Sequence, residues 1–425
     1  MSNATDTYLT THEQELYDLG DQLFLHPELG FKEWETGRII RAFCKAHELP
    51  IHQEYALTGF SVRIGSGEPH IGLIAELDAI PVAGHPCANP ETNAAHACGH
   101  STQCAIMLGA LAALKDSLKS EQGTVTLYFT PAEEFTDMEY RNSLVKEGKV
   151  RYCSGKQNML AERIFEEEDL LIHLHAMTNP VYQYSIGSVL SGFVYKKITF
   201  LGKASHAAAL PHLGINALNE CTLFLNALNM LRETFQEEDV VRLHGMITKG
   251  GTTVNSIPEE VVYECYVRSV NPEVIQEVND KVNRAAIHCA NALGGEVRIE
   301  DTPGYLPLHQ SKELNEVIHR SILKYAREED ILYGEISAAA GDVGDICMFK
   351  PIIQYGYNGF TGAIHGADLA IVNKEQVYVT QARIVADAVE TLLSEPDTVA
   401  RIKDSFQPKM SYEEYIRYLS GKRKD

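Results

Sequence analysis

The chain has 425 residues, of which 44% are hydrophobic and 22% charged, and its formal net charge is -21. This composition is typical of a globular protein, and the length exceeds what one ordinary core holds, so we expect two domains. The negative charge argues against nucleic acid and anionic membranes as partners, and no apolar run is long enough to cross a bilayer.

The N-terminus, MSNATDTYLTTHEQELYD, is polar and acidic, without the basic start and apolar stretch of a signal peptide. The nine cysteines are scattered and odd in number, which argues against a disulfide framework. We therefore expect a cytoplasmic protein in which most cysteines are small buried apolar residues.

The first part of the chain alternates helices and strands. Leu16, Leu19 and Leu23 recur at helical spacing, and Pro27 marks the end of that helix. The apolar patterns predict helices at 13–29, 35–49 and 104–118, and strands at 60–65, 70–81, 123–134 and 168–177. This rhythm predicts a sheet with helices on both faces.

The pattern changes between residues 190 and 303. Strands are predicted at 193–203, 240–251, 259–271 and 295–302, and helices at 214–235 and 272–294. Their order, β-α-β-β-α-β, is that of a ferredoxin-like unit. We therefore predict a catalytic domain in two parts, 1–189 and 304–425, with an inserted domain at 190–303. The second part contains a helix at 311–328, a strand at 351–357, a helix at 374–393 and a basic end, GKRKD, that we expect to be solvated.

Polar side chains follow several of the predicted strands. Asp78, the pair Glu133 and Glu134, and the pair His173 and His175 end three apolar runs, and His365 follows a fourth by a short loop. In α/β sheets, ligands bind outside the carboxyl ends of the strands, so these segments should converge on one edge.

The stretch NAAHACGHSTQC adds soft ligands just ahead of a helix. In an extended segment alternate residues face the same way, so His96, Cys98 and His100 could all point at one site. A thiolate, imidazoles and a carboxylate suit zinc, cobalt, manganese or nickel, and the helix start should lower the pKa of the thiol. A redox role is weaker because no Cys-x-x-Cys pair is present. A Cys/His nucleophile stays open, although it leaves Glu133 and Glu134 without a role.

The chain resembles the di-metal amidohydrolases. HPELGFKEWET, AELDAIP, HACGHSTQCAIMLGA, TPAEE, HLHAM, GKASHAAALPHLGINAL, NSIP and GAIHGAD occur in that family's order, over about residues 15–390. The family includes aminoacylases, hippurate hydrolase, indole-acetyl-amino-acid hydrolases and related carboxypeptidases. AAGDVGDICMFKP looks more like the aminobenzoyl-glutamate hydrolase branch. The resemblance implies an α/β fold: a di-zinc-peptidase-like catalytic domain with a mixed sheet, and an inserted ferredoxin-like lid or dimerisation domain.

The resemblance also implies two divalent metal ions, which would be zinc, manganese, cobalt or nickel. Cys98 would bridge them as a thiolate. His100 and Glu134 would complete the site of one metal, and His175 and His365 that of the other.

Further roles follow from the same resemblance. Glu133 would be the general base that activates water and later protonates the leaving amine. Asp78 would orient a metal ligand, and His206 would reach from the lid into the active site of the partner subunit to stabilise the oxyanion. Asn255 and Arg268 would hold the substrate carboxylate.

Some positions depart from the family pattern. Ser101 and Gln103 stand where the family usually has Asp and His, and Glu76 stands where many carboxypeptidase relatives have a ligating His. Residues 135–168 form a longer segment than the hippurate branch has, which either lines the substrate entrance or is surface elaboration.

Together these features predict an enzyme that hydrolyses the amide of N-acyl or N-aroyl amino acids to a carboxylate and a free amino acid. An aminobenzoyl-glutamate-type or dipeptide hydrolase is the alternative within the family. From other classes, a catalytically inactive metal-binding dimer and a scaffolding dimer that uses the lid remain open. A homodimer through the lid is expected in each case.

Overall fold

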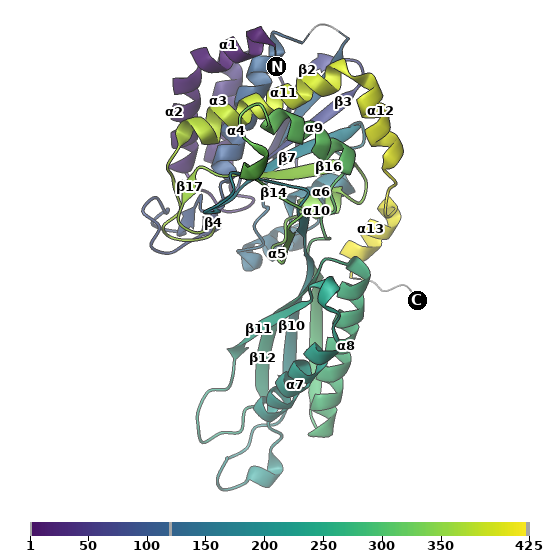
Figure 1. Ribbon diagram of the computed structural model, residues 1–425. Coiled ribbons are helices and arrows are strands. Elements are labelled where there is room, and N and C mark those ends of the chain that lie inside the picture. Colours follow the sequence, from purple (N-terminus) through teal and green to yellow (C-terminus); the bar gives the residue numbers. More distant parts are fainter. Residues whose placement is uncertain (1, 119–120, 422–425) are drawn as a thin grey trace. The chain divides into compact units, whose positions relative to one another are not determined.

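The computed structural model describes residues 2–118 and 121–421, which form two compact units (Figure 1). The larger unit comprises Met1–Ser188, His309–Ile336 and Asp345–Ser411, and the smaller comprises Val189–Leu308, Ser337–Gly344 and Tyr412–Asp425. The segments 337–344 and 412–425 thus belong with the smaller unit, not with the catalytic part to which the sequence pattern assigned them. Backbone bonds from Ser191 to Ser337 and Ala339 explain the first of these assignments. The basic end lies outside the described residues except for Gly421.

An eight-stranded mixed sheet forms the centre of the larger unit, in the order β1-β2-β6-β3-β7-β16-β8-β14. Its strands are β1 (Ile51–Tyr55), β2 (Gly59–Ser66), β3 (His70–Glu76), β6 (Gly123–Thr130), β7 (Leu170–Ala176), β8 (Tyr184–Ile186), β14 (Ile331–Tyr333) and β16 (Ile352–Tyr357). The central strands β6, β3, β7 and β16 are parallel, so their carboxyl ends share one edge.

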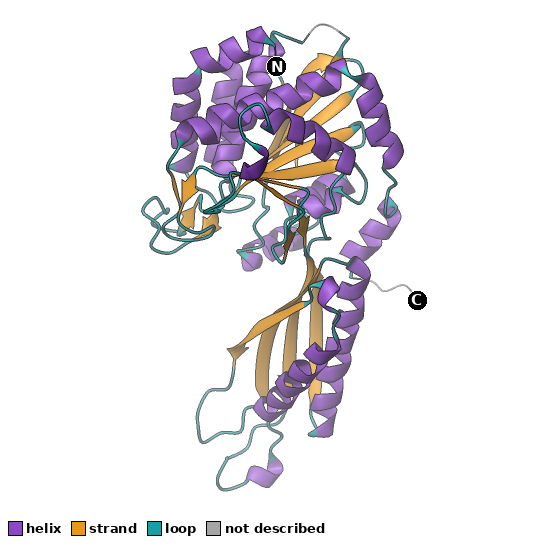
Figure 2. Ribbon diagram, viewed as in Figure 1, coloured by secondary structure: helices purple, strands orange, loops and turns teal. Residues whose placement is uncertain are grey.

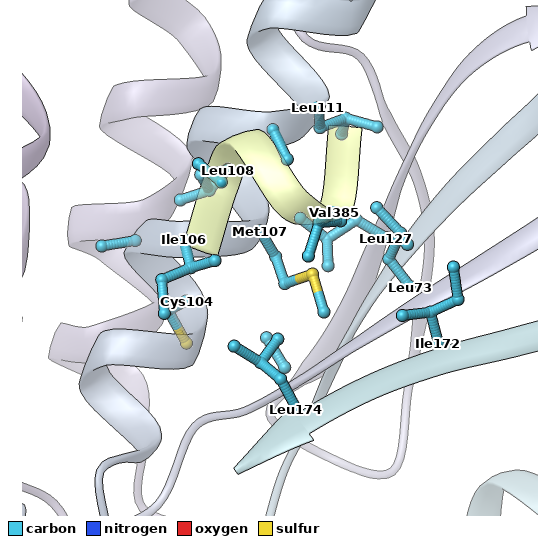
Figure 3. Packing of buried hydrophobic residues seen from close by; sticks show 14 of the residues in the cluster. Leu73, Cys104, Ile106, Met107, Leu108, Leu111, Leu127, Ile172, Leu174 and Val385 are labelled. Carbon is cyan, nitrogen blue, oxygen red and sulfur yellow. The ribbon is translucent and has the colours of Figure 1, made fainter. Parts of the chain in front are cut away.

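Helix α4 (His100–Lys115) packs directly on this sheet and is buried from His100 to Leu114. Leu73, Leu127 and Ile172 of the strands meet it in one apolar cluster (Figure 3). Helices α2 (Glu13–Phe24) and α11 (Gln381–Ser394) cover its other side, which explains why α4 is apolar all round.

The remaining elements of the larger unit surround this core. Its other helices are α1 (Asn3–Thr11), α3 (Trp34–Ala46), α5 (Met138–Lys146), α6 (Gly155–Ala161), α9 (Lys312–Ile322), α10 (Val343–Ile346) and α12 (Pro396–Ser405). The short strands pair as β4 (Ile80–Pro81) with β5 (Ala94–Ala95), β9 (Val189–Leu190) with β15 (Ile336–Ser337), and β17 (Phe360–Thr361) with β18 (Ala370–Ile371). The helix predicted at 374–393 opens with π-helical turns at Glu375–Thr380.

The smaller unit has the predicted β-α-β-β-α-β order. It runs β10 (Gly192–Leu201), α7 (Ala217–Leu231), β11 (Arg242–Lys249), β12 (Glu260–Ser269), α8 (Pro272–Ala292) and β13 (Glu296–Pro303), and α13 (Tyr412–Leu419) contacts β13. The sheet is antiparallel, in the order β11-β12-β10-β13, with α7 and α8 on one face (Figure 2). This is the ferredoxin-like arrangement expected of the inserted domain.

Among the described helices, none combines the length and the apolar character that crossing a membrane requires.

Candidate metal centre

A glycine turn presents Cys98 and His100 at the carboxyl edge of the large sheet. Gly99 precedes α4 with φ 89°, and a Cβ at this position would lie 2.4 Å from the Ala176 Cβ. Only glycine fits both the left-handed backbone and the close approach. The segment is therefore not extended through His100 as predicted, and alternation does not place His96 in the site: its buried ring belongs to neither of the ligand groups described below.

Two groups of candidate ligands share the Cys98 sulfur. The first joins Cys98 with His100 and His175, and the second joins it with Glu134 and His365; within each group the ligand atoms lie within 4.8 Å of one another. Sγ of Cys98 is 3.3 Å from Nε2 of His175 and 3.2 Å from Nε2 of His365. All five candidates thus come together. The expected pairs differ, however, because His100 lies with His175, and Glu134 with His365.

The backbone and neighbouring groups orient these side chains. The amide of His365 donates to the Ala97 carbonyl at 2.7 Å, which holds this residue at φ 64° beside Cys98. Nδ1 of His175 lies 2.8 Å from the carbonyl oxygen of Ala176, which leaves Nε2 to face the site. His365 Nε2 lies 3.2 Å from Glu134 Oε1.

Asp78 and Glu133 lie beside the two ligand groups. The Asp78 carbonyl accepts a hydrogen bond from His100 Nδ1 at 2.8 Å, and its carboxylate accepts one from the Glu134 amide at 3.0 Å. Asp78 therefore orients two candidate ligands, as expected. A carboxylate oxygen of Glu133 lies 3.9 Å from His100 Nε2 and is buried, which places a second acid next to the centre.

The electrostatics of the site fit a bound cation. Burial and the nearby Glu134 carboxylate raise the pKa of the Cys98 thiol well above its usual range, so the expected lowering by the helix start is wrong: desolvation outweighs it. Burial lowers the pKa of His175 to about 4, so its ring is neutral and ready to ligate. In the described part of the chain, Glu134 Oε1 and His100 Nε2 are buried without a hydrogen bond of good geometry. Divalent cations would satisfy these donors and stabilise the thiolate.

A buried polar cluster supports His100 from behind. Glu76 Oε2 lies 3.0 Å from His100 Nε2, and Glu76 Oε1 lies 2.7 Å from the Lys156 ammonium. Gln103 donates to the Glu76 carboxylate at 2.9 Å and accepts from its amide at 3.0 Å. Burial alone would raise the pKa of Glu76, but Lys156, His173 and His100 outweigh it and hold that pKa well below its usual range. Gln103, a departure from the family pattern, thus holds Glu76 in place.

Sequence reasoning missed Lys156, because a lysine between polar residues reads as exposed. Replacing it by Met should lower the free energy of unfolding by about 3 kcal/mol, since it leaves the Glu76 charge buried without its cation. Urea unfolding of the purified variant measures this change. Lys149→Met, which removes the exposed partner of Glu147, is the matched control and should leave the midpoint unchanged. Equal midpoints for both variants would contradict the role of the buried pair.

The lid residues predicted from sequence fall into two places within the smaller unit. His206 and Asn255 are neighbours, because His206 pairs with Ser256 and the Ala207 amide donates to the Asn255 carbonyl at 3.0 Å. Arg268 lies near the other end of β12, where it donates to the Ala338 carbonyl at 3.0 Å and packs between Phe193 and Tyr266. One lid therefore does not bring Asn255 and Arg268 together.

Comparison with known proteins agrees with this geometry. The N-acetyl-L-cysteine deacetylase of Bacillus subtilis (strain 168) is 29% identical over 283 residues, 64% of each chain. One of the chains of the p-aminobenzoyl-glutamate hydrolase of Escherichia coli (strain K12) is 26% identical over 66% of this chain and 56% of its own. This chain thus spans under two thirds of these two relatives. The human Xaa-Arg dipeptidase is 25% identical over 95% of this chain and 91% of its own.

Solved structures share the fold. The Bacillus subtilis YXEP protein, a dinuclear metal-binding peptidase from the M20 family, superposes with a TM-score of 0.70 at 20% identity, over 91% of this chain and 99% of its own. An aminobenzoyl-glutamate utilization protein from Klebsiella pneumoniae gives 0.64 at 15% identity, over 90% and 97%. The family model for peptidase family M20/M25/M40 matches residues 72–391. The chain therefore belongs to peptidase family M20/M25/M40.

Proposed function

We propose that this protein is a dinuclear metal-dependent amidohydrolase that cleaves N-acyl or N-aroyl amino acids to a carboxylate and a free amino acid. Membership of this peptidase family makes it a hydrolase of amide bonds. The observation that carries the finer proposal is the pair of ligand groups that share Cys98, with the Glu133 carboxylate beside them.

The two ligand groups would each hold one divalent cation, and Cys98 would serve both. When bound, the cations supply Lewis acidity at the scissile carbonyl and lower the pKa of water. The donor set of sulfur, imidazole and carboxylate suits zinc, manganese, cobalt or nickel.

The chain's own residues move the proton. The Glu133 carboxylate takes a proton from the attacking water, and its carboxyl group then gives this proton to the leaving nitrogen, so that the amine departs neutral. Asp78 keeps His100 and the Glu134 backbone in position during both steps through its carbonyl and its carboxylate. Burial of Glu133 excludes competing water from the carboxyl group.

The substrate class follows from the relatives together with the site. The relatives named above act on an acetylated amino acid, an aroyl-glutamate and a dipeptide, which share an amide next to a free carboxylate. An N-acyl amino acid has this form, and an aroyl-glutamate or a dipeptide is the alternative. In this proposal Asn255 and Arg268 hold the substrate carboxylate, and His206 stabilises the oxyanion.

A panel of N-acetyl, N-benzoyl, aminobenzoyl-glutamate and dipeptide substrates tests the proposal, assayed with added Zn, Mn, Co or Ni. We expect turnover of at least one acylated amino acid that EDTA abolishes and added metal restores. Elemental analysis of the same samples should give two divalent metals per chain. Metal without turnover on any amide would instead support a metal-binding protein, and absence of metal would support a scaffold.

We further propose a homodimer through the lid. β11 is the edge strand of the lid sheet, and its Met246 is 63% exposed. Exposed apolar residues on an unpaired edge favour pairing with a second copy. His206 and Asn255 lie at the end of the lid opposite to the one at which the chain enters at Gly192, which agrees with their serving the partner subunit's site.

Light scattering during size exclusion tests the dimer. The wild type should elute with twice the mass of one chain, and Met246→Lys should shift it toward the monomer. Lys197→Met, on an inner strand of the same sheet, is the control and should leave the mass unchanged. A wild-type monomer at micromolar concentration would contradict the proposal.

A further inference from the structure

A tight corner in the larger unit carries the two glutamates of the metal centre. β6 ends at Thr130, and Ala132 then takes a φ of 54° directly before Glu133 and Glu134. This left-handed conformation is unfavourable for alanine, because its Cβ crowds the following carbonyl. The surrounding contacts must therefore hold the corner in place.

Two buried side chains bind the Ala132 backbone from opposite ends. Its amide donates to Glu33 Oε1 at 2.8 Å, and its carbonyl accepts from the Arg141 guanidinium at 3.1 Å. Arg141 is 0% exposed and Glu33 is 1% exposed, so water does not compete for either contact. We call Glu33 and Arg141 the corner clamp.

Arg141 also connects the corner to Asp78. Its guanidinium donates to the Cys153 carbonyl at 2.8 Å, and its second terminal nitrogen lies 3.7 Å from the Asp78 carboxylate. The same carboxylate oxygen accepts the hydrogen bond from the Glu134 amide. One arginine thus reaches both sides of the segment that carries Glu133 and Glu134.

The charges in this dry region balance only with Arg141 present. Glu33 and Asp78 are both buried carboxyl groups, and burial followed by the charge of Asp78 raises the pKa of Glu33 to about 7. The guanidinium supplies a positive charge beside Asp78 and keeps this residue an acceptor.

Helix α5 is docked so that Arg141 arrives in a fixed position. Lys32 pairs with Asp137 at the start of α5 at 2.7 Å, and its ammonium lies 4.1 Å from the centre of the Tyr140 ring. A Cβ at Gly30 would lie 2.2 Å from the guanidinium, so this glycine leaves room for Arg141. The preceding turn and α5 therefore fit each other around the arginine.

We propose that Arg141 is a positioning residue for catalysis. Together with Glu33 it holds Ala132 in its left-handed conformation, and this conformation aims the Glu133 carboxylate. Arg141 acts through Ala132 and Asp78 and does not touch the substrate. The inference rests on the proposed function, because it takes Glu133 as the general base. It also gives part of the long segment 135–168 a role other than surface elaboration or lining of the entrance.

A double-mutant cycle with Ala132→Gly tests this inference. Glycine adopts a positive φ without help, so it should make the clamp less necessary. Arg141→Lys keeps the charge but loses the fork, and should lower kcat about tenfold or more while KM stays within about threefold. In the Ala132→Gly background the same substitution should lower kcat by about threefold or less. A purely structural arginine would show no such rescue.

The clamp offers a second variant in case Arg141→Lys does not fold. Glu33→Met removes the acceptor of the Ala132 amide and should lower kcat with the same rescue, whereas Glu33→Gln keeps an acceptor and should lose less. Arg151→Met, at an exposed arginine of the same segment, is the matched control and should keep wild-type kinetics.

Each outcome of the cycle is decisive. All rates are taken per folded, metal-loaded chain, on a substrate that the wild type hydrolyses. A wild type that hydrolyses no amide defeats the proposed function itself. An active wild type with unchanged kcat in Arg141→Lys, or with equal losses in both backgrounds, overturns the role of Arg141 alone.

Discussion

Replacing Glu133 by Gln should lower kcat by about 10²- to 10⁴-fold, with KM and metal content close to those of the wild type. Gln has nearly the same size as Glu but cannot take a proton from water or deliver one to the leaving nitrogen. The Glu133 carboxylate lies beside His100 and belongs to neither of the two groups that share Cys98. Steady-state kinetics and elemental analysis of the purified variant measure both quantities.

The adjacent carboxylate provides the control. Glu134→Gln changes a member of a ligand group, so it should lower the metal content together with the rate. The two variants therefore separate proton transfer from metal binding at neighbouring positions. If Glu133→Gln retained wild-type turnover, the assignment of the general base would be wrong.

Replacing Cys98 by Ala should cause the largest loss of metal. Its sulfur is the one atom common to both ligand groups, so its removal weakens both positions at once. We expect fewer than two metals per chain and a loss of activity that excess metal restores only in part. Equilibrium dialysis followed by elemental analysis measures the metal content.

The same cysteine makes metal binding depend on pH. The thiol must lose its proton to bind a cation, and burial with Glu134 raises its pKa well above the usual range. Below that pKa the metal affinity of the wild type should therefore fall about tenfold for each unit of decreasing pH per proton released. Cys44→Ala, at a buried cysteine of α3, is the control and should keep both the metal and the pH dependence. Retention of two metals by Cys98→Ala would show that the sulfur is not shared.

The fold was largely predictable because its signals are local. The apolar runs of β3, β6 and β7 and the alternation of β10 and β12 depend on a few neighbouring residues. The assignment of 337–344 to the smaller unit was not predictable, because it depends on bonds between Ser337 and Ser191, which are far apart in the sequence. The π-helical opening of the last long helix likewise leaves no mark in the apolar spacing.

The candidate site was predictable in membership but not in arrangement. Cys98, His100 and Glu134 stand in short motifs, so the sequence indicates them directly. Which imidazole lies with which carboxylate depends on the turns at Gly99 and His365, whose backbone angles the sequence does not reveal.

The supporting residues were hidden for another reason. Lys156 and Arg141 are charged residues within polar segments, and such residues are usually exposed. Only the folded chain shows that each meets a buried acid: Lys156 meets Glu76, and Arg141 meets Asp78.

The position of β16 in the large sheet bears on how the protein is synthesised. This strand, Ile352–Tyr357, lies between β7 and β8, although the whole smaller unit separates it from them in the sequence. During translation β7 therefore waits with an unpaired edge while the ferredoxin-like unit emerges and folds. Such an edge exposes a nascent chain to aggregation, so folding on the ribosome should depend on chaperones until the last third of the chain has been made.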